Sequence, residues 1–361
     1  MDLAELDFAF PEELIAQHPR EPRDACRLLV LARDSGAIAH RIFRDLPELL
    51  VPGDVLVLND SRVLPARLRA VKETGGRVEL LFLRAVDAPL SNGGRVWEAL
   101  ARPSHRLRAG LRLRLPGGES VSLERSLGAG RWLVAGPEGS SLLDVMDRWG
   151  EMPLPPYIKA SLRDRSEYQT VFAAEPGSAA APTAGLHFTQ DLLTRLRVAG
   201  VQTATVTLHV GLDTFRPIST GRVEDHPIHT EAYRVDHATL AALNSARATG
   251  RRLVAVGTTT VRVLETLYAE AREGAPATGP AAGFTDIFIT PGYRFRAVDA
   301  LITNFHLPRT SLLALVMAFA GVELTRHAYA EAVAQRYRFF SFGDAMLIHG
   351  DLAGQAGVGR S

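Results

Sequence analysis

The pattern of β-forming, helix-forming and turn residues changes twice along the chain, and this change limits the possible folds more than any other feature. Between Arg62 and about Ala135, short segments rich in β-forming residues recur, and glycine pairs separate several of them. Such spacing is typical of a small antiparallel barrel or sandwich. The strands predicted in this region are Val63–Val71, Arg77–Leu83, Val96–Ala101, Leu111–Leu115, Val121–Leu123 and Trp132–Val134.

On either side of this region the pattern is different. The apolar run Val55–Leu58 predicts a strand just before it. Beyond Gly150 the predicted elements are a helix at Asp191–Ala199, a strand at Val201–Val210, a helix at Ala238–Ala248, a strand at Arg252–Val256 and a helix at Val261–Glu273. Strand, turn and helix in this order indicate an α/β layer.

The sequence therefore predicts an α/β protein with two domains. A large discontinuous mixed α/β domain takes residues 1–61 and 150–350, and a small antiparallel β-barrel domain, residues 62–149, is inserted into it. Residues 351–361 are expected to form a C-terminal tail. A chain of 361 residues, 46% of them hydrophobic, is long enough to bury both cores.

Composition narrows the setting in which the protein works. Met1 is followed by Asp2 and Glu5 rather than by a basic and then apolar run. The longest apolar run, Leu312–Ala320, is about half of the roughly 20 residues that cross a bilayer, so we expect a buried helix, no membrane association and a cytoplasmic location. Cys26 is the only cysteine, which excludes an internal disulfide and a zinc site built from several cysteines. Because the formal net charge is only +1, attraction to nucleic acid requires a local patch.

Three histidines follow predicted turns or strand ends. His187 lies in APTAGLHFT, where small residues allow a ligand to approach the backbone. His209 lies at the end of the strand in VTLHVG, a place where α/β sheets hold ligands. Asn304 and His306 lie in TNFHLP, between an apolar strand and a helix, and offer donors and acceptors to a heterocycle or a sugar. A packed or solvated structural role is the alternative for each histidine.

The segment AVGTTTVR predicts an anion site. A strand is followed by Gly257, by three threonines that begin at Thr258, and by a helix, so backbone N–H groups and hydroxyls meet at a helix N-terminus. Arg262 follows about one turn later. The alternative is simple N-capping by Thr258 or Thr259, which accounts for one threonine better than for three.

Motifs of several familiar enzyme classes are absent. The chain has no GxGxxG after its first strand, no GxxxxGK[ST], no GxSxG and no HExxH, which argues against Rossmann dehydrogenases, P-loop kinases and α/β-hydrolases. His226 and His229 resemble metal ligands, but residues three apart on an extended segment face opposite sides. We therefore expect no metal site.

A basic stretch, RPSHRLRAGLRLR at residues 102–114, contains no acidic residue. This stretch, called the arginine strip below, carries Arg102, His105, Arg106, Arg108, Arg112 and Arg114. It is a candidate phosphate-binding surface on the predicted barrel. The alternative is a solvated edge strand that its charge protects from aggregation.

Motifs spread over the whole chain resemble one protein family. They are LDFAFPEELIAQHP, GDVLVLNDSRVLPARL, MPLPPYI, YQTVFA, APTAGLHFT, TLHVG, AVGTTTVRVLE, TNFHLPRTSLLALV and YRFFSFGDAML, and they run from Leu6 to Leu347. Several of these segments are long and low in degeneracy. Together they resemble the S-adenosylmethionine:tRNA ribosyltransferase-isomerase (QueA) family of queuosine biosynthesis.

The resemblance implies an enzyme that uses S-adenosylmethionine as a ribosyl donor. The acceptor would be the aminomethyl group of 7-aminomethyl-7-deazaguanine at the wobble position of tRNA. Epoxyqueuosine-tRNA, adenine and methionine would be the products. The family fold, a large α/β domain with a small inserted β-barrel, agrees with the segmentation above. No metal is implied, and we expect a monomer.

Such a reaction suggests roles for the candidate residues. A base must remove a proton beside the sulfonium, adenine must leave with a proton, and the donor carboxylate must be held. We expect His187 or His306 to act as the base or the acid, with His209 as a third catalytic candidate. The expected donor-binding residues are Thr183, Gly185, Gly257, Thr258, Thr259, Arg262 and Asn304, and the expected substrate-binding residues are Asp60, Arg62, Asp344, Arg102, Arg106 and Arg108. Within the first set, Thr258 and Thr259 would hold the methionine carboxylate with help from Arg262.

Two positions depart from the family pattern. Asp213 stands where the family segment HVGxGTF has a glycine, and aspartate tolerates a positive φ less well than glycine does. Ile228 to Glu231 reads IHTE where the family favours MHSE, a change that keeps His229 and Glu231.

Two other functions compete with this interpretation. A transglycosylase that exchanges the tRNA base would be expected to carry a cysteine-rich zinc site, and the single cysteine argues against it. A non-catalytic tRNA-binding module would need only the arginine strip, and the histidine loops would then be incidental.

Overall fold

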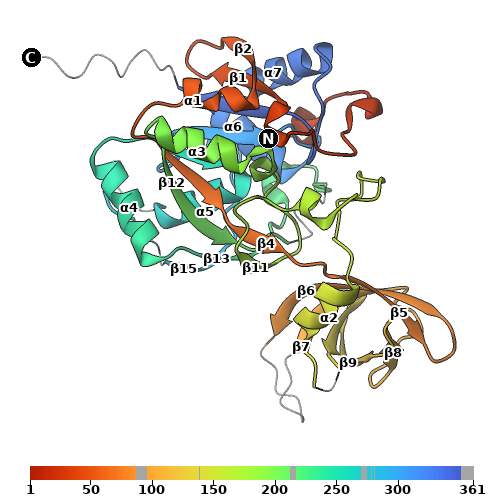
Figure 1. Cartoon of the computed structure of the whole chain (residues 1–361). Coiled ribbons are helices and arrows are strands. Elements are labelled where there is room, and N and C mark those ends of the chain that lie inside the picture. The colour runs from red at the N-terminus through yellow and green to blue at the C-terminus, as the bar shows by residue number, and fades with distance from the viewer. Residues whose placement is uncertain are drawn as a thin grey trace, which may run out of the picture. The chain divides into compact units, whose positions relative to one another are not determined.

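Two compact units make up the computed structural model of the protein (Figure 1). The structure describes residues 1–86, 96–137, 139–211, 217–269, 275–277, 279 and 281–350. The sheet unit comprises Met1–Ser61, Pro156–Glu175 and Pro182–Ser361, and the barrel unit comprises Arg62–Pro155 and Pro176–Ala181. The limits predicted for the inserted domain, residues 62–149, stay a prediction. The predicted tail, residues 351–361, and Asp213 lie outside the described residues.

Helices and strands have the following bounds. The α-helices are α1 (Leu46–Leu49), α2 (Leu142–Trp149), α3 (Gln190–Val198), α4 (His237–Ala248), α5 (Thr258–Leu267), α6 (Ser311–Ala320) and α7 (Val322–Ala334). The strands are β1 (Arg27–Ala32), β2 (Ile38–Ile42), β3 (Val55–Asn59), β4 (Ser61–Val63), β5 (Arg67–Lys72), β6 (Arg77–Val86), β7 (Val96–Arg102), β8 (Arg112–Arg114), β9 (Ser120–Gly128), β10 (Arg131–Ala135), β11 (Glu175–Ser178), β12 (Gln202–Leu208), β13 (Glu231–Arg234), β14 (Leu253–Val256), β15 (Ala282–Thr285), β16 (Ala300–Asn304) and β17 (Ala345–His349). Short 3-10 helices include η4 (Phe43–Asp45) and η6 (Thr183–His187).

The sheet unit is built on a nine-stranded mixed sheet with the order β15-β13-β12-β3-β14-β16-β17-β1-β2. Its neighbours β12, β3, β14 and β16 run parallel to one another. They therefore end on one side of the sheet, which we call the carboxyl side. β17 runs antiparallel to β16, and β1 runs parallel to β17, so these two strands begin on the carboxyl side.

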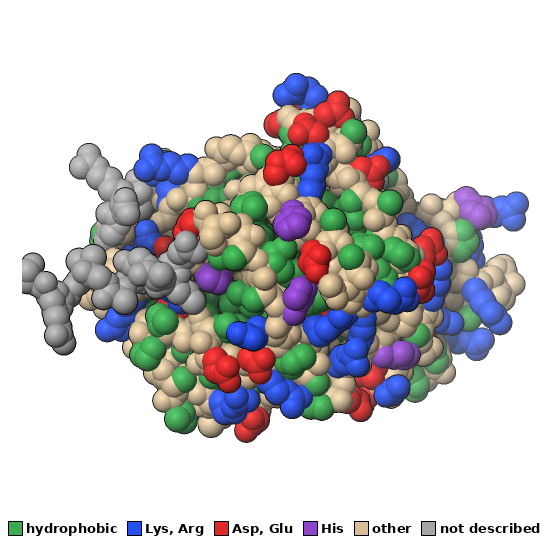
Figure 2. All heavy atoms as spheres, turned by 90° about the horizontal axis from the view of Figure 1, so that it is seen from above, with side chains coloured by type: hydrophobic (Ala, Val, Ile, Leu, Met, Phe, Trp, Pro, Cys, Tyr) green, Lys and Arg blue, Asp and Glu red, His purple; other side chains and the backbone are tan. Residues whose placement is uncertain are grey.

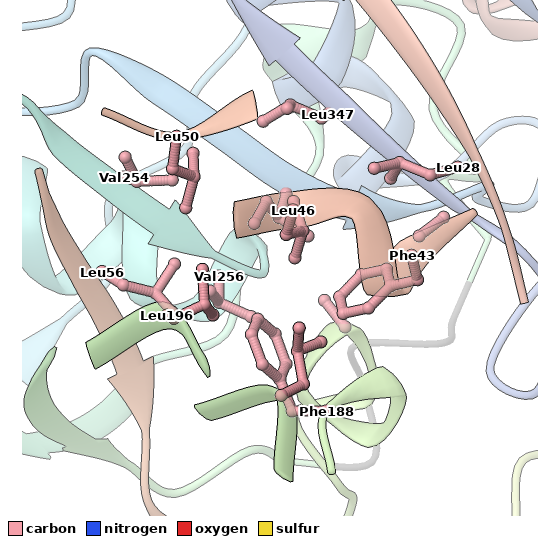
Figure 3. Packing of buried hydrophobic residues seen from close by; sticks show 14 of the residues in the cluster. Leu28, Phe43, Leu46, Leu50, Leu56, Phe188, Leu196, Val254, Val256 and Leu347 are labelled. Atoms are coloured by element: carbon pink, nitrogen blue, oxygen red, sulfur yellow. The ribbon is translucent and has the colours of Figure 1, made fainter. Parts of the chain in front are cut away.

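Apolar runs explain why three of these strands are central. β3 (VLVLN), β14 (LVAV) and β16 (ALITN) are buried at every position, as expected for strands covered on both faces. On one face, Leu56 and Val254 pack with Phe43, Phe188 and Leu196, which come from η4 and from the region of α3 (Figure 3). α4 and α5 also pack against β12 and β14. The core thus holds the ends of the central strands in fixed positions.

The barrel unit contains a closed barrel with the strand order β10-β7-β6-β5-β8-β9, in which all neighbouring strands are antiparallel. Leu68, Leu80 and Leu113 are among the side chains buried in its core. This unit and the mixed sheet confirm the predicted fold class. β8 pairs with β5 on one side and with β9 on the other, so the alternative that the arginine strip contains an edge strand is wrong.

Two predicted boundaries differ from the structure. α5 begins at Thr258 rather than at Val261, because Gly257 takes the N-cap position with a φ of 87°. The predicted helix end, Glu273, lies outside the described residues. The strand predicted to reach Val210 ends at Leu208.

The apolar run Leu312–Ala320 lies in α6, whose residues are mostly buried, as predicted. In the part of the chain that the structure describes, no single helix is long and apolar enough to span a membrane. α6 and α7 pass that test only as a pair, and this pair is bent by 112°.

Candidate active site

Polar residues collect on the carboxyl side of the sheet because four parallel strands end there. Asp60 follows β3, His209 follows β12, Thr258 opens the helix after β14, and His306 lies just beyond β16. Neighbouring strands are about 4.8 Å apart, so His209 lies three spacings, roughly 14 Å, from the end of β16. The residues lie at strand ends as predicted, but the sheet order keeps His209 away from His306.

A first pocket in the sheet unit combines aromatic and polar side chains. Its lining residues, which define the Asn304 pocket, are Tyr157, Thr183, Asn304, Phe305, His306, Leu307, Thr310, Leu312, Phe340 and Ser341. Phe340 has a φ of 68°, which is unusual for a bulky residue, and its ring centroid lies 4.9 Å from that of Tyr157. Aromatic rings beside amide, hydroxyl and imidazole groups suit a heterocyclic ligand.

His306 offers one ring nitrogen to the Asn304 pocket. Its Nε2 lies 2.7 Å from Thr303 Oγ1, and its backbone N–H donates to the Tyr329 hydroxyl at 2.9 Å. Burial lowers the pKa of His306 to about 3, so the imidazole is neutral at neutral pH. Because Nε2 is engaged with Thr303, Nδ1 is the nitrogen left for a ligand.

His187 lies behind Asn304 and does not line either pocket. The Asn304 amide donates from Nδ2 to His187 Nε2 at 3.0 Å, and His187 Nδ1 lies 3.3 Å from Cys26 Sγ. Burial is the main reason that the pKa of His187 falls to about 4. The two predicted catalytic histidines therefore differ in place, since His306 lines the pocket and His187 contacts a residue that does.

The second pocket lies at the N-terminus of α5. Its lining residues, which define the Thr258 pocket, are Ile228, His229, Glu231, Thr258, Thr259, Arg262, Ile287, Phe288, Ile289, Ser311, Leu312 and Leu315. Gly257 is the N-cap and provides no side-chain cap, so the alternative of N-capping by Thr258 or Thr259 is wrong. Thr258 is buried and lines this pocket. Open N–H groups and a hydroxyl suit a carboxylate.

The two pockets are adjacent, because Leu312 lines both of them. Leu312 lies in the first turn of α6, directly after the loop that carries His306. The two pockets therefore share one wall residue.

Arg262 is already held by several protein partners in the structure. It forms an ion pair with Glu231 and donates to the carbonyl oxygens of His229 at 3.3 Å and Thr285 at 3.2 Å. The His229 Nε2 lies 3.0 Å from the same Glu231 carboxylate. This geometry makes Arg262 part of the pocket wall, and it does not support the predicted contact of Arg262 with a donor carboxylate.

Asp344 and Gly185 have structural contacts rather than open positions. Asp344 is fully buried and accepts hydrogen bonds from the backbone N–H groups of Arg27 at 2.9 Å and Arg338 at 2.8 Å. A Cβ atom at Gly185 would lie 2.7 Å from the ring of Phe172, so this glycine is needed for packing. Neither geometry supports the ligand contact that the sequence predicts.

Asp60 and His209 lie outside both pockets. Asp60 accepts a hydrogen bond from the Thr207 hydroxyl at 2.7 Å, and burial raises the pKa of its carboxyl group. His209 is partly buried, which lowers its pKa, and its Nδ1 has no partner among the described residues. These two residues remain candidates for contacts with a large substrate.

The apparent metal ligands of the sequence have other roles. His229 faces Glu231, as described above, and the His226 ring packs 6.1 Å from the Phe288 ring. Across the described ranges, no group of three or more histidine, cysteine, aspartate or glutamate residues is arranged to hold a metal ion.

The arginine strip lies on the barrel unit, from the last residue of β7 through the following loop and along β8. Its arginines, at positions 102, 106, 108, 112 and 114, are all exposed. Arg62 belongs to the same unit and is partly buried. On the face shown in Figure 2, basic and acidic side chains are interspersed, in keeping with the net charge of +1. The arginine strip, whose sequence contains no acidic residue, therefore differs from the mixed charges on that face.

Sequence reasoning missed three residues that shape the Asn304 site. From the sequence, Cys26 indicates only that no internal disulfide can form, whereas in the structure its thiol contacts His187. Tyr157 and Phe340 line the pocket. They occur in the motifs MPLPPYI and YRFFSFGDAML, and membership of those motifs was the one available signal.

Acidification is expected to destabilise the sheet unit through His187 and His306. Burial lowers their pKa values to about 4 and about 3 from the ordinary value of 6.5. Below that ordinary value the unfolded chain binds more protons than the folded chain, so stability falls as the pH decreases. At roughly pH 5 each histidine should lower the free energy of unfolding by about 2 kcal/mol.

Urea unfolding at neutral pH and at roughly pH 5 measures this effect. His187→Gln has no imidazole to protonate, so its pH dependence should be smaller than that of the wild type by about 2 kcal/mol. The exposed residue His327 provides the control, since His327→Gln should keep the full pH dependence. An unchanged pH dependence in His187→Gln would contradict a buried neutral imidazole at this position.

Comparisons with known proteins agree with the resemblance of the motifs. Residues 3–348 match the family described as "Queuosine biosynthesis protein". The S-adenosylmethionine:tRNA ribosyltransferase-isomerases of Rubrobacter xylanophilus and Symbiobacterium thermophilum are 54% and 52% identical to the chain, over 96% of this chain and 97% and 100% of theirs. A crystal structure of S-adenosylmethionine tRNA ribosyltransferase from Thermotoga maritima is 39% identical, with a TM-score of 0.53 and coverage of 95% of this chain and 99% of that one. The chain therefore belongs to the queuosine biosynthesis protein family, the family of the S-adenosylmethionine:tRNA ribosyltransferase-isomerases.

Proposed function

We propose that the protein transfers and isomerises the ribosyl group of S-adenosylmethionine onto 7-aminomethyl-7-deazaguanine at the wobble position of tRNA. The products are epoxyqueuosine-tRNA, adenine and methionine. The observation that carries the proposal is the pair of adjacent pockets that share Leu312. One suits a heterocycle and the other suits a carboxylate, and S-adenosylmethionine has both groups at opposite ends.

The Thr258 pocket is assigned to the methionine end of the donor. The first N–H groups of α5, those of Thr258 to Thr260, have no acceptor within the helix, and the helix dipole favours a negative charge there. The Thr258 hydroxyl adds a donor. Arg262 supports this pocket indirectly, because its ion pair with Glu231 holds the wall.

The Asn304 pocket is assigned to the nucleoside end. Phe340 and Tyr157 offer ring faces for stacking on a purine, and Thr183 offers its hydroxyl. His306 lines the same pocket. In S-adenosylmethionine the reacting ribose carbon lies between the two ends that are assigned to the pockets. The pocket therefore has the groups needed for binding and for proton transfer.

In this proposal His306 moves the proton. The sulfonium makes the neighbouring 5′-CH₂ protons acidic, and the Nδ1 lone pair of neutral His306 accepts one of them. Thr303 Oγ1 lies 2.7 Å from Nε2, and this step requires the tautomer in which Nε2–H donates to that oxygen, since only this tautomer leaves the lone pair on Nδ1. The imidazolium then returns its proton to a ring nitrogen of adenine as the glycosidic bond breaks, so one residue acts first as base and then as acid.

Release of the small products tests the proposed function. The purified protein is mixed with S-adenosylmethionine and with tRNA that carries the precursor base. We expect adenine and methionine in equal amounts and a gain in mass of the tRNA, and tRNA with guanine at the wobble position should give neither. Binding of the tRNA without adenine release would instead support a non-catalytic tRNA-binding module.

The arginine strip is proposed to bind tRNA phosphates. The double variant Arg106→Gln/Arg108→Gln should weaken tRNA binding and reduce the slope of log K against log salt by about 2, because two phosphate contacts are lost. The KM for S-adenosylmethionine should not change. Salt titrations of tRNA binding measure both the affinity and the slope.

A matched double variant controls for the loss of charge alone. Arg77 and Arg125 are exposed on the same barrel unit, but they lie outside the arginine strip. Arg77→Gln/Arg125→Gln should leave the salt slope close to that of the wild type. Equal slopes for the two double variants would mean that the strip has no special part in tRNA binding.

We further propose that the enzyme acts in the cytoplasm as a monomer and without a metal ion. This part of the proposal follows from the resemblance of the motifs to the family. Activity should persist in EDTA, and it should elute at the size of a single chain. Activity confined to a larger species, or abolished by the chelator, would contradict this part of the proposal.

A further inference from the structure

The groups around Asn304 determine how its amide is oriented. Asn304 Nδ2 donates to the Phe340 carbonyl oxygen at 3.2 Å, and a carbonyl oxygen can only accept. The nitrogen of the amide, and not its oxygen, must therefore face Phe340. The other proton of Nδ2 goes to His187 Nε2 at 3.0 Å, and Oδ1 accepts a hydrogen bond from Thr183 Oγ1 at 2.9 Å.

This orientation determines the tautomer of His187. Because Nε2 receives a proton from Asn304, it must carry the lone pair, so the hydrogen of the neutral ring lies on Nδ1. Nδ1–H then donates to Cys26 Sγ at 3.3 Å. Burial raises the pKa of the Cys26 thiol well above its ordinary value, so this acceptor is uncharged. Each nitrogen of His187 is thus occupied by a protein partner.

The same chain of hydrogen bonds gives Thr183 a fixed polarity. Its hydroxyl has one proton, and that proton is donated to Asn304. Only lone pairs of Oγ1 remain for a ligand in the Asn304 pocket, which Thr183 lines. An oxygen in this state accepts hydrogen bonds but cannot donate one.

We propose that Thr183 is an obligate acceptor that selects an N–H or O–H group of the nucleoside part of S-adenosylmethionine, and that His187 is a positioning residue that maintains this polarity through Asn304. The inference rests on the proposed function for the identity of the ligand. It separates the two histidines, because proton transfer belongs to His306 and His187 transfers no proton. It also gives Cys26 a role, since its thiol is the buried end of this chain of hydrogen bonds.

Steady-state kinetics test the role of Thr183. Thr183→Val keeps the shape of the side chain and removes the acceptor, so the KM for S-adenosylmethionine should rise about tenfold or more with little change in kcat. Thr183→Ser keeps the acceptor, and its KM should stay within about threefold of the wild-type value. A Thr183→Val enzyme with the wild-type KM overturns the proposal.

Two variants test whether His187 transfers a proton. His187→Gln puts an amide oxygen near the position of Nε2 and has no titratable group, so kcat should stay within about fivefold of the wild type with an unchanged pH profile. His187→Leu leaves Asn304 without its acceptor, and we expect kcat/KM to fall at least about tenfold. If folded His187→Gln loses about 10² in kcat, His187 is an acid–base residue and the proposal fails.

The tautomer of His187 can be measured without any activity. In protein that contains ¹⁵N-labelled histidine, long-range ¹H–¹⁵N correlation spectra distinguish a protonated ring nitrogen from one with a lone pair, and His187→Gln identifies the signals. We expect the Nδ1–H tautomer of His187, and an Nε2–H tautomer or a charged ring overturns the inference. If the wild type releases no adenine but His187 shows the Nδ1–H tautomer, the proposed function fails. The polarity of the hydrogen bonds from Cys26 to Thr183 is supported in that case.

Discussion

Replacing His306 by glutamine is expected to lower turnover by about 10² or more. His306 lines the Asn304 pocket and its Nε2 contacts Thr303. In the proposed mechanism Nδ1 is therefore the atom that takes the proton from the donor. Glutamine has a similar reach and keeps a polar end, but an amide cannot accept and return a proton at neutral pH. The KM for S-adenosylmethionine should change little, because the ring faces and hydroxyl groups of the pocket remain.

Single-turnover release of adenine measures this effect, with circular dichroism to confirm that the variant is folded. The matched control is His327→Gln, since His327 is an exposed residue of α7 that lines neither pocket. Its rate should equal that of the wild type. A His306→Gln enzyme that keeps a third or more of the wild-type rate would contradict the proposal that His306 transfers the proton.

Replacing Asp54 by asparagine should lower the free energy of unfolding by about 3–5 kcal/mol. Asp54 and Arg252 precede β3 and β14, on the side of the sheet opposite to the carboxyl side. Both side chains are buried, and Arg252 donates to the carboxylate at 2.8 and 2.5 Å. The asparagine amide is uncharged, so in Asp54→Asn the buried guanidinium would lose its counter-charge.

Thermal and urea unfolding measure the loss, which should appear as a fall in Tm on the order of 10 °C. The control is Glu323→Gln, because Glu323 forms an exposed ion pair with Arg326 on α7, and such pairs contribute little. The KM of folded Asp54→Asn for S-adenosylmethionine should match the wild type. A loss of less than about 1 kcal/mol would contradict the account of a buried, unscreened pair.

The barrel and the central strands could be predicted because their signals are local. Strands such as β5 and β6 alternate between more and less buried residues over much of their length, so a short window of sequence contains the pattern. β3, β14 and the helix α6 stand out as apolar runs. β1 and β17 were not predicted, since they pair with each other from opposite ends of the chain. No local window contains that pairing.

The residues of the candidate site could be predicted from the sequence, but distinct roles could not be assigned to them. Both histidine motifs combine small or apolar residues with a histidine, which made His187 and His306 equivalent. They differ because His187 contacts Cys26 and Asn304, which lie 161 and 117 residues away in the chain. Arg262 likewise looked available to a ligand, and its partner Glu231, 31 residues earlier, meets it only after β13 folds beside α5.

A crystal structure with S-adenosylmethionine bound tests the account most directly, because the account assigns each end of the donor to one pocket. We predict the adenine ring against Phe340 and Tyr157, an N–H or O–H of the nucleoside on Thr183 Oγ1, and the methionine carboxylate on the N–H groups near Thr258. The 5′ carbon should lie about 3–3.5 Å from His306 Nδ1. A donor bound outside the two pockets, or bound with its carboxylate in the Asn304 pocket, would contradict the account.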